Sequence, residues 1–141
     1  MTPATDLRAA RHPACVVCSP TCGHGLRVRF ALDDHDGAVG HFDCAPAFEG
    51  YPGLLHGGVT SALLDGAMTD WLFLHGATAV TAELNVRFRH PVALGEPATL
   101  RAWLQAQRGG VYRLEAELLQ GEQRRATATA TFMRRRSEGQ G

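Results

Sequence analysis

The longest apolar stretch of the chain runs from Val59 to about His75 and predicts one helix. Its apolar residues cover most of the helix circumference, which is typical of a helix inside a core rather than on a surface. Ser61, Asp65 and Thr69 interrupt it at intervals of four residues, so they form one narrow polar stripe. Asp70 lies off that stripe, and we expect it to have a solvated or structural role.

On both sides of this helix, apolar and polar residues alternate with a period of two, which predicts strands. The predicted strands are Gly25 to Leu32, Ala38 to Cys44, Thr78 to Arg89, Ala98 to Gln107, Val111 to Gln120 and Arg124 to Phe132. Small residues alternate with threonines in the last strand, which fits a sheet lying close against a helix. The order β–β–α–β–β–β–β predicts an α+β fold, with a curved antiparallel sheet wrapped round the helix. We expect one domain over residues 14–133, between flexible tails at 1–13 and 134–141.

Composition and charge exclude some classes of function. The chain has 141 residues, and its 14 basic and 14 acidic residues give a formal net charge of zero. This balance argues against a nucleic-acid or membrane-surface protein. The first twenty residues lack the apolar centre of a signal peptide, and two aspartates interrupt the apolar helix. We therefore expect a cytoplasmic protein with neither nucleic-acid nor membrane partners.

Candidate chemistry gathers at the start of the helix, in the segment His56-Gly57-Gly58. A helix start presents free backbone N–H groups, which together form a cup for a negatively charged or polarised oxygen. Asp65 follows within the helix, among apolar neighbours. Because burying a lone carboxylate is costly, a functional carboxylate is one interpretation. A carboxylate held by neighbouring hydroxyls, or one facing solvent, is the other.

The spacing between cup and carboxylate has a consequence for assembly. Asp65 lies roughly 10 Å along the helix axis from the Gly57 and Gly58 amides, at about 1.5 Å per residue. One reacting carbonyl cannot contact both, since its partners must lie within about 3 to 3.5 Å. If cup and carboxylate cooperate, they come from two subunits related by a two-fold axis. The sequence therefore predicts a dimer.

Four potential metal ligands precede the first strand: Cys15, Cys18, Cys22 and His24. A Cys-x2-Cys pair with a further cysteine and histidine is compatible with zinc. Only one closely spaced pair exists, however, so reduced thiols that pack against the sheet are the preferred interpretation. We assign no metal ligand, expect no cofactor and give His12 no function.

Several motifs of the chain belong together in one known family. They are Leu55-His56-Gly57-Gly58, Leu63-Leu64-Asp65, Asn85-Val86-Arg87-Phe88-Arg89-His90-Pro91 and Leu94-Gly95-Glu96. With the predicted layout, they resemble the hotdog-fold thioesterases, in particular the phenylacetate-pathway (PaaI-like) group. The resemblance covers residues 24 to 133. It implies hydrolysis of acyl-coenzyme A by a homodimer or a dimer of dimers.

The resemblance also implies roles for single residues. Asp65 corresponds to the general base or nucleophile, and the Gly57 N–H to an oxyanion donor in a cup that His56 shapes. Gly58, which has no side chain, allows the substrate to come close to the helix start and is therefore expected to bind substrate. Thr81 stands where related enzymes carry a hydroxyl that helps to position the attacking water.

Four further residues are expected to bind substrate. Ser61 flanks the carboxylate on the polar stripe, and Tyr51 precedes the helix, where it could gate a pocket. Arg87 and Arg89 are candidates for binding the nucleotide phosphates, because guanidinium groups bind phosphate well. Solvated strand charges are the alternative for both arginines.

The chain departs from its relatives at two positions. Some relatives have an asparagine six residues before the histidine, where this chain has Gly50, and another subgroup has a glutamate where it has Gly66. We expect Gly66 to allow close packing of two central helices. These absences keep a non-catalytic acyl-CoA-binding module open as the alternative to a thioesterase. A hydratase is less favoured, because it needs a histidine and an acid in one pocket.

Overall fold

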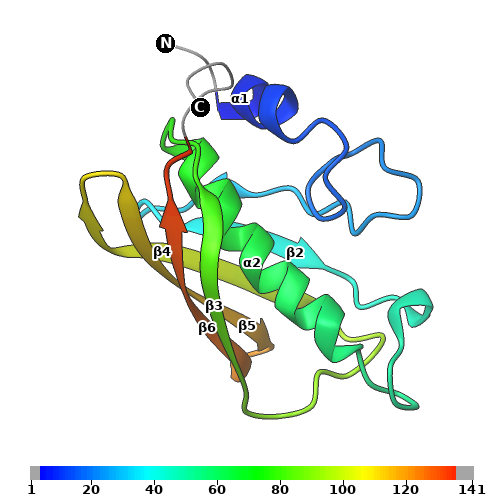
Figure 1. Cartoon of the computed structure of the whole chain (residues 1–141). Coiled ribbons are helices and arrows are strands. Elements are labelled where there is room, and N and C mark those ends of the chain that lie inside the picture. The colour runs from blue at the N-terminus through cyan, green and yellow to red at the C-terminus, as the bar shows by residue number, and fades with distance from the viewer. Residues whose placement is uncertain (1–3, 136–141) are drawn as a thin grey trace.

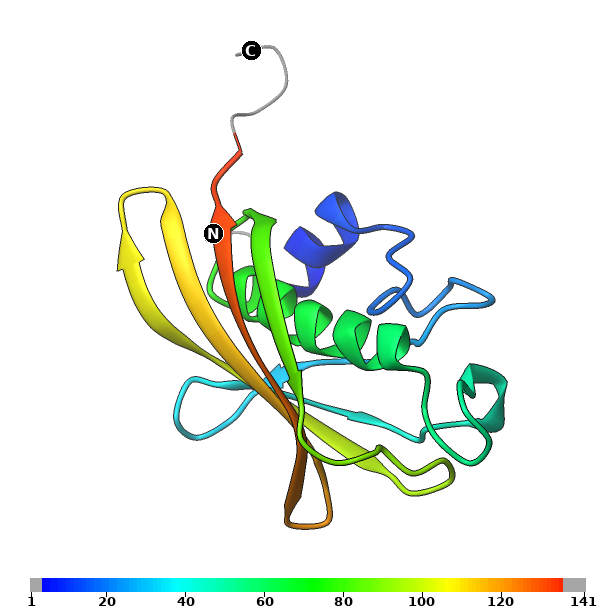
Figure 2. The ribbon, with the colours of Figure 1, turned by 60° about the horizontal axis from the view of Figure 1, so that its bottom comes forward.

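The computed structural model describes residues 4–135 and shows a six-stranded antiparallel sheet curved round one long helix (Figures 1 and 2). The strand order is β1-β2-β4-β5-β6-β3. The elements are α1 (Ala4–Arg11), β1 (Ala31–Leu32), β2 (Ala38–Phe42), the 3-10 turn η1 (Pro46–Phe48), α2 (Gly57–Leu74), β3 (Val80–Phe88), β4 (Ala98–Arg108), β5 (Val111–Gln120) and β6 (Gln123–Met133). This architecture confirms the predicted α+β hotdog fold and its element order.

The core lies between α2 and the concave face of the sheet. Leu63, Leu64 and Leu72 of α2 are fully buried. On β6, Ala126, Ala128, Ala130 and Phe132 face the helix and are at most 5% exposed. Small alanine side chains leave room for α2 to pack closely against the central strands, as the alternation in the sequence predicts.

The first predicted strand pairs with its neighbour only at its end. Ala31 and Leu32 pair with β2, whereas the preceding residues bond to a loop. The Leu26 N–H donates to the Val16 carbonyl at 2.6 Å, and the Val28 N–H donates to the Val17 carbonyl at 2.8 Å. Leu26, Val28 and Phe30 are still buried, so the predicted alternation holds while the backbone partner differs.

The N-terminal segment is more ordered than the sequence indicates. Residues 4–11, which we expect to lie in a flexible tail, form α1, and Figure 1 shows this helix beside the C-terminal half of α2. Its contacts with α2 are tertiary, and periodicity within eight residues does not reveal them. Of the predicted C-terminal tail, residues 136–141 lie outside the described part of the chain.

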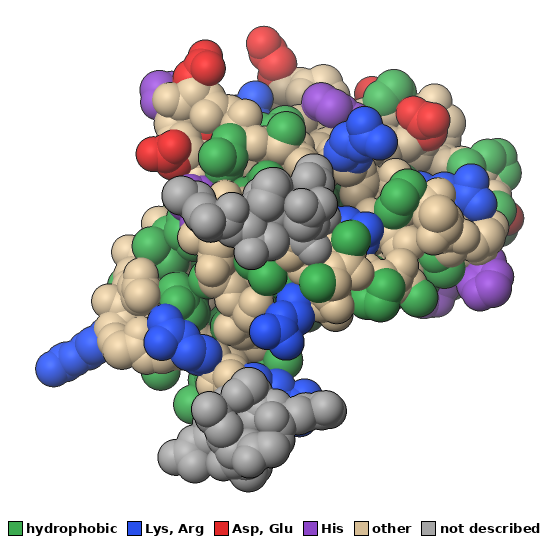
Figure 3. Space-filling view, turned by 90° about the horizontal axis from the view of Figure 1, so that it is seen from above, with side chains coloured by type: hydrophobic (Ala, Val, Ile, Leu, Met, Phe, Trp, Pro, Cys, Tyr) green, Lys and Arg blue, Asp and Glu red, His purple; other side chains and the backbone are tan. Residues whose placement is uncertain are grey.

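Charged side chains are dispersed over the surface. Figure 3 shows basic side chains spread across one face and acidic ones toward one edge, with hydrophobic side chains between them. The described part of this face therefore lacks a concentrated field of one sign, of the kind that attracts polyanions. Among the described helices, none has both the length and the apolar character needed to cross a bilayer.

Gly66 packs against the chain's own N-terminal segment. A Cβ added at this position would lie 2.5 Å from Cγ1 of Val17, closer than real carbon atoms approach. The glycine therefore makes room for Val17, which corrects the prediction that it serves contact between two central helices.

This contact gives a stability prediction for Gly66→Ala. Alanine favours the helix by about 1 kcal/mol, but overpacking costs typically 1–3 kcal/mol. We expect a lower free energy of unfolding in the wild-type background. In a Val17→Ala background, where the obstructing methyl groups are absent, the same change should be neutral or stabilising. Urea denaturation of the four proteins tests this, and an equal effect in both backgrounds would show that the two residues do not clash.

Candidate active site

The start of α2 offers one free backbone donor rather than two. His56 is the N-cap residue, and its Nδ1 accepts the Gly58 N–H at 2.8 Å. The imidazole must therefore be unprotonated at Nδ1 and carry its proton on Nε2. Within the described chain, no group accepts a hydrogen bond from the Gly57 N–H. Of the predicted cup, Gly57 is thus the available donor, while Gly58 is occupied by the histidine that holds the helix start.

A pocket of about 850 Å³ opens beside this donor. Its walls come from residues 49–51, from Leu54 to Gly58, and from Phe88 at the end of β3 to Pro91. Tyr51 is 81% exposed and Phe88 is 55% exposed, so both present apolar surface to a ligand. Phe88 also approaches Gly57, since a Cβ built on that glycine would lie 3.7 Å from its ring.

Asp65 has a partner from the neighbouring strand. The Thr81 hydroxyl donates a hydrogen bond of 2.7 Å to Asp65 Oδ1. Burial raises the pKa of the Asp65 carboxyl above its ordinary value, and the Thr81 hydroxyl partly opposes that rise by stabilising the charged form. The structure therefore brings together two of the four residues to which the resemblance gives catalytic roles.

A β-bulge aims Thr81 at the helix. Thr81 lies opposite the inward-facing Phe132, and Glu83 lies opposite Thr131, so Ala82 is an extra residue on β3. From Leu84 onward, alternate residues of β3 lie opposite the inward-facing alanines of β6. Strict alternation would turn Thr81 outward, and the bulge reverses its direction.

The other hydroxyls of the polar stripe serve the helix itself. Ser61 Oγ donates to the Gly57 carbonyl at 3.1 Å, and Thr69 Oγ1 donates to the Asp65 carbonyl at 2.9 Å. Both bonds reach back one helical turn. The stripe exists as predicted, but its hydroxyls bond to the backbone and leave the carboxylate to Thr81.

The two halves of the candidate site are separate within one chain. The pocket beside Gly57 is not lined by Asp65 or Thr81. Eight residues of α2 separate Gly57 from Asp65, which corresponds to about 12 Å along the axis. One chain therefore supplies a pocket with an amide donor at one place and a half-buried carboxylate at another.

The two arginines differ in position. Arg89 lines the pocket, and its Nε lies 3.4 Å from Thr127 Oγ1. Arg89 also lines a hollow on the other face of the sheet, beside Trp103 and Glu117, whereas Arg87 lines this hollow and not the pocket. Only Arg89 is therefore next to the candidate site.

Several pocket residues were absent from the predicted site, among them Glu49 and Phe88. Glu49 Oε2 accepts the Gly53 N–H at 2.9 Å and so shapes the loop before α2. Phe88 reaches the pocket because its register on β3 turns it toward α2. The motif from Asn85 to Pro91 contains Phe88, but the direction of its side chain follows from strand pairing.

Comparison with known proteins identifies relatives. Residues 52–127 match the family model described as thioesterase superfamily, which is more than half of the chain. The acyl-coenzyme A thioesterase THEM4 of Bos taurus is 33% identical over 82 residues, covering 58% of this chain and 33% of its own. The chain thus spans about a third of the length of this curated relative.

Solved structures share the fold. A phenylacetic acid degradation-related protein of Ralstonia eutropha JMP134 is 27% identical with a TM-score of 0.72, covering 89% of this chain and 96% of its own. The PaaI protein of E. coli, from its phenylacetic acid degradation operon, is 20% identical with a TM-score of 0.77, covering 93% and 97%.

The contact between Thr81 and Asp65 gives a prediction that needs no substrate. Thr81→Val removes the hydrogen bond that favours the charged carboxylate, so the pKa of Asp65 should rise further above its ordinary value. NMR titration of the side-chain carboxyl carbon measures this pKa. Thr69→Val is the matched control, because its hydroxyl bonds to a backbone carbonyl. An unchanged or lower Asp65 pKa in Thr81→Val would contradict the assigned contact.

Proposed function

We propose that this chain, which belongs to the thioesterase superfamily, hydrolyses acyl-coenzyme A thioesters to a free acid and coenzyme A. One observation carries the proposal: Asp65, a largely buried carboxylate on the core helix, accepts a hydrogen bond from Thr81. Both residues lie within the matched range of the family model. The name of the Bos taurus relative supports acyl-coenzyme A as the substrate class.

The proposed chemistry divides between an amide and a carboxylate. When water attacks the thioester, the carbonyl oxygen gains negative charge, and the Gly57 N–H stabilises that charge by a hydrogen bond. His56 holds the helix start in place through its bond to the Gly58 N–H. Asp65 either removes the proton of the attacking water or attacks the carbonyl itself, which forms a mixed anhydride. Thr81 fixes the carboxylate in both routes and is near enough to orient water.

The Gly57 N–H and Asp65 can act on one substrate, despite their separation along α2, if the site is shared by two chains. Two helices packed antiparallel about a two-fold axis would bring each Gly57 to the partner's carboxylate. Strand β3 supports such a pairing, since it ends the sheet and Val80, Leu84 and Phe88 are 37–55% exposed on it. Exposed apolar residues on an unpaired edge favour association with a second strand. We propose a homodimer, and a dimer of dimers would contain the same shared site.

Substrate binding is proposed for the pocket beside Gly57. The acyl chain or pantetheine arm would contact Phe88 and Tyr51, with Tyr51 gating the pocket from the loop. Arg89 is the proposed phosphate ligand, because it lies at the pocket. Arg87 has the weaker claim, since it lines the opposite face of the sheet. Ser61 contributes by supporting the first turn of α2 at the Gly57 carbonyl.

The lack of space for a side chain at Gly50 favours a non-catalytic acyl-coenzyme A-binding module as the second candidate function. A Cβ added at Gly50 would lie 2.9 Å from the Cα of His56, so any side chain there would force the backbone apart. The asparagine that some relatives carry at this position therefore does not fit this loop. A chain without that polar group could bind acyl-coenzyme A and hydrolyse it poorly.

Asp65→Asn separates the two candidates. The amide cannot accept the proton of water, so thiol release from acyl-coenzyme A should fall by about 10²–10⁴-fold while substrate affinity stays within a few-fold. Thiol release is measured with acetyl, hexanoyl, palmitoyl, benzoyl and phenylacetyl thioesters, and affinity by calorimetry. Asp34→Asn, at an exposed turn, is the control. Binding without hydrolysis by the wild-type chain would favour the binding module, and full activity in Asp65→Asn would refute the role of this carboxylate.

A further inference from the structure

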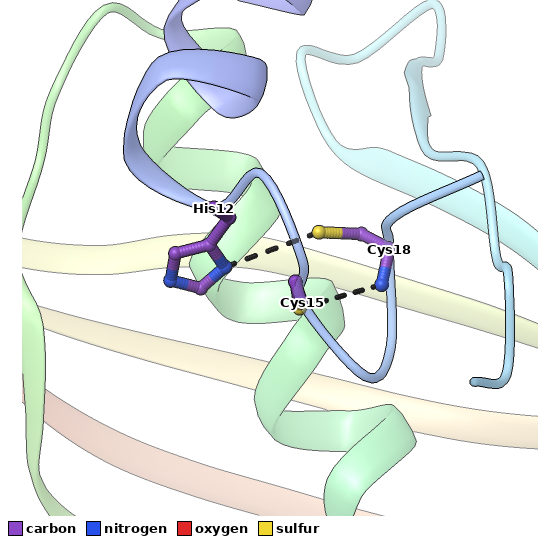
Figure 4. Close-up of side chains that lie close together, drawn as sticks. All are labelled: His12, Cys15 and Cys18. Carbon is purple, nitrogen blue, oxygen red and sulfur yellow. Dashed lines mark hydrogen bonds between the residues drawn. The ribbon is translucent and has the colours of Figure 1, made fainter. Parts of the chain in front are cut away.

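Three side chains of metal-ligand type meet where the chain leaves α1 and crosses α2. They are His12, Cys15 and Cys18, and Figure 4 shows them around one small space beside the helix. Their ligand atoms all lie within 4.8 Å of one another, and His12 Nδ1 is 3.9 Å from Cys18 Sγ. In a tetrahedral zinc site, ligand atoms lie about 3.3–3.8 Å apart, given metal bonds of about 2.0–2.3 Å. Small side-chain movements would therefore close the cluster round an ion.

The backbone already supports the sulfur of Cys15. The N–H groups of Val17 and Cys18 point at Cys15 Sγ, at 3.3 and 3.4 Å. Donors of this kind stabilise a thiolate, which is the form that binds metal. The loop of the Cys-x2-Cys pair is thus folded so that both sulfurs face the same space as His12.

A buried carboxylate on α2 is the candidate for a fourth ligand, outside the three ligand atoms that lie mutually close. Asp70 lies on α2 and is only 5% exposed, so of its two expected roles the solvated one is wrong and the structural one stays open. Its Oδ2 is buried and has no hydrogen-bond partner among the described residues. Burial raises the pKa of the Asp70 carboxyl to about 6, and the neighbouring Cys18 thiol partly opposes this rise. A buried, unpartnered carboxylate oxygen is costly, and a bound cation would supply the missing partner.

We propose that His12, Cys15, Cys18 and Asp70 bind one Zn²⁺ ion. Zinc suits this mixture of sulfur, nitrogen and oxygen donors, whereas Mg²⁺ and Ca²⁺ prefer oxygen alone. Four protein ligands close the coordination shell, which is the pattern of structural rather than catalytic zinc. The ion would fasten the segment after α1 to the helix that carries Asp65. This site is independent of the proposed hydrolysis.

The ligand set differs from the one that the sequence suggests. Cys22 and His24 do not belong to the cluster, and His12 takes their place from the other side of the pair. Arg8 Nη1 lies 3.7 Å from Cys18 Sγ, so this guanidinium is the cationic neighbour that would compete for the sulfur's charge. A divalent ion bonded to four donors would compensate the buried negative charge more fully than the one contact between Arg8 and Cys18 does.

Metal content is the first test. The full chain, reduced and passed through a column with a weak chelator, should retain about one zinc ion per chain by mass spectrometry. Cys22→Ser is the matched control and should retain the same amount. The double variant Cys15→Ser/Cys18→Ser should retain almost none. Equal zinc in the double variant and the wild type would overturn the site.

Cobalt identifies the donors without reference to activity. Chelated protein refilled with Co²⁺ should show thiolate-to-metal charge transfer and the strong d–d bands of tetrahedral cobalt, in wild type and Cys22→Ser alike. Asp70→Asn should keep the charge transfer but weaken metal affinity about 10–100-fold. Unchanged affinity in Asp70→Asn would remove that residue from the set.

If Cys15→Ser/Cys18→Ser does not fold, competition for Zn²⁺ between the wild-type protein and a chelator still tests the proposal. Reduced wild-type protein freed of metal is titrated with Zn²⁺ against a chromophoric chelator, and stoichiometric uptake supports the site. If the reduced protein takes up no Zn²⁺, the proposal fails. A mass lower by two hydrogens before reduction, in wild type and Cys22→Ser alike but not in the double variant, would then indicate a Cys15–Cys18 disulfide instead.

Discussion

The structure depends on the burial of most of α2. The sheet covers one side of this helix, and the segment after α1 covers another, where Gly66 makes room for Val17. A carboxylate on a covered side has little solvent to stabilise its charge, so it needs a specific partner. Asp65 and Asp70 lie on the same helix, and each meets a different set of groups. The helix that forms the core thus also sets the chemistry of both candidate sites.

The position of Asp65 follows from strand pairing as much as from the helix. The bulge at Ala82 turns Thr81 inward, and the resulting hydrogen bond fixes the carboxylate two turns away from the free Gly57 N–H. A thioester carbonyl cannot contact both groups of one chain. The separation therefore makes assembly part of the proposed catalysis, because the proposed catalytic set would be complete only where two copies of α2 meet. The distance between the Gly57 N–H and the Asp65 carboxylate therefore connects the fold and the edge strand β3 with the proposed activity.

Sequence periodicity was sufficient for the fold and insufficient for the directions of key side chains. The apolar helix, the order of elements along the chain and the inward row of alanines on β6 follow from local pattern, because burial in this fold repeats with the period of each element. The inward turn of Thr81 requires a bulge, which breaks that period, and the resemblance alone pointed to this residue. The meeting of His12 with Cys15 and Cys18 depends on how a loop crosses α2, and no local spacing encodes it. The burial of Asp70 was missed for the same reason, since the segment with Cys15 and Cys18 was expected to pack against the sheet.

Subunit complementation tests the shared site most directly. Gly57→Pro removes the amide hydrogen alone, because proline suits the first helical position and His56, with φ −59° and ψ 133°, already has the conformation of a residue before proline. Separately, Gly57→Pro and Asp65→Asn should both be nearly inactive. Co-expressed in equal amounts, they form mixed dimers in which one of the two sites has an intact amide from one chain and an intact carboxylate from the other. Thiol release should then return to about a quarter of the wild-type rate, since half of the dimers are mixed. If the mixture stays as inactive as the separate variants, amide and carboxylate belong to one chain and the account is wrong.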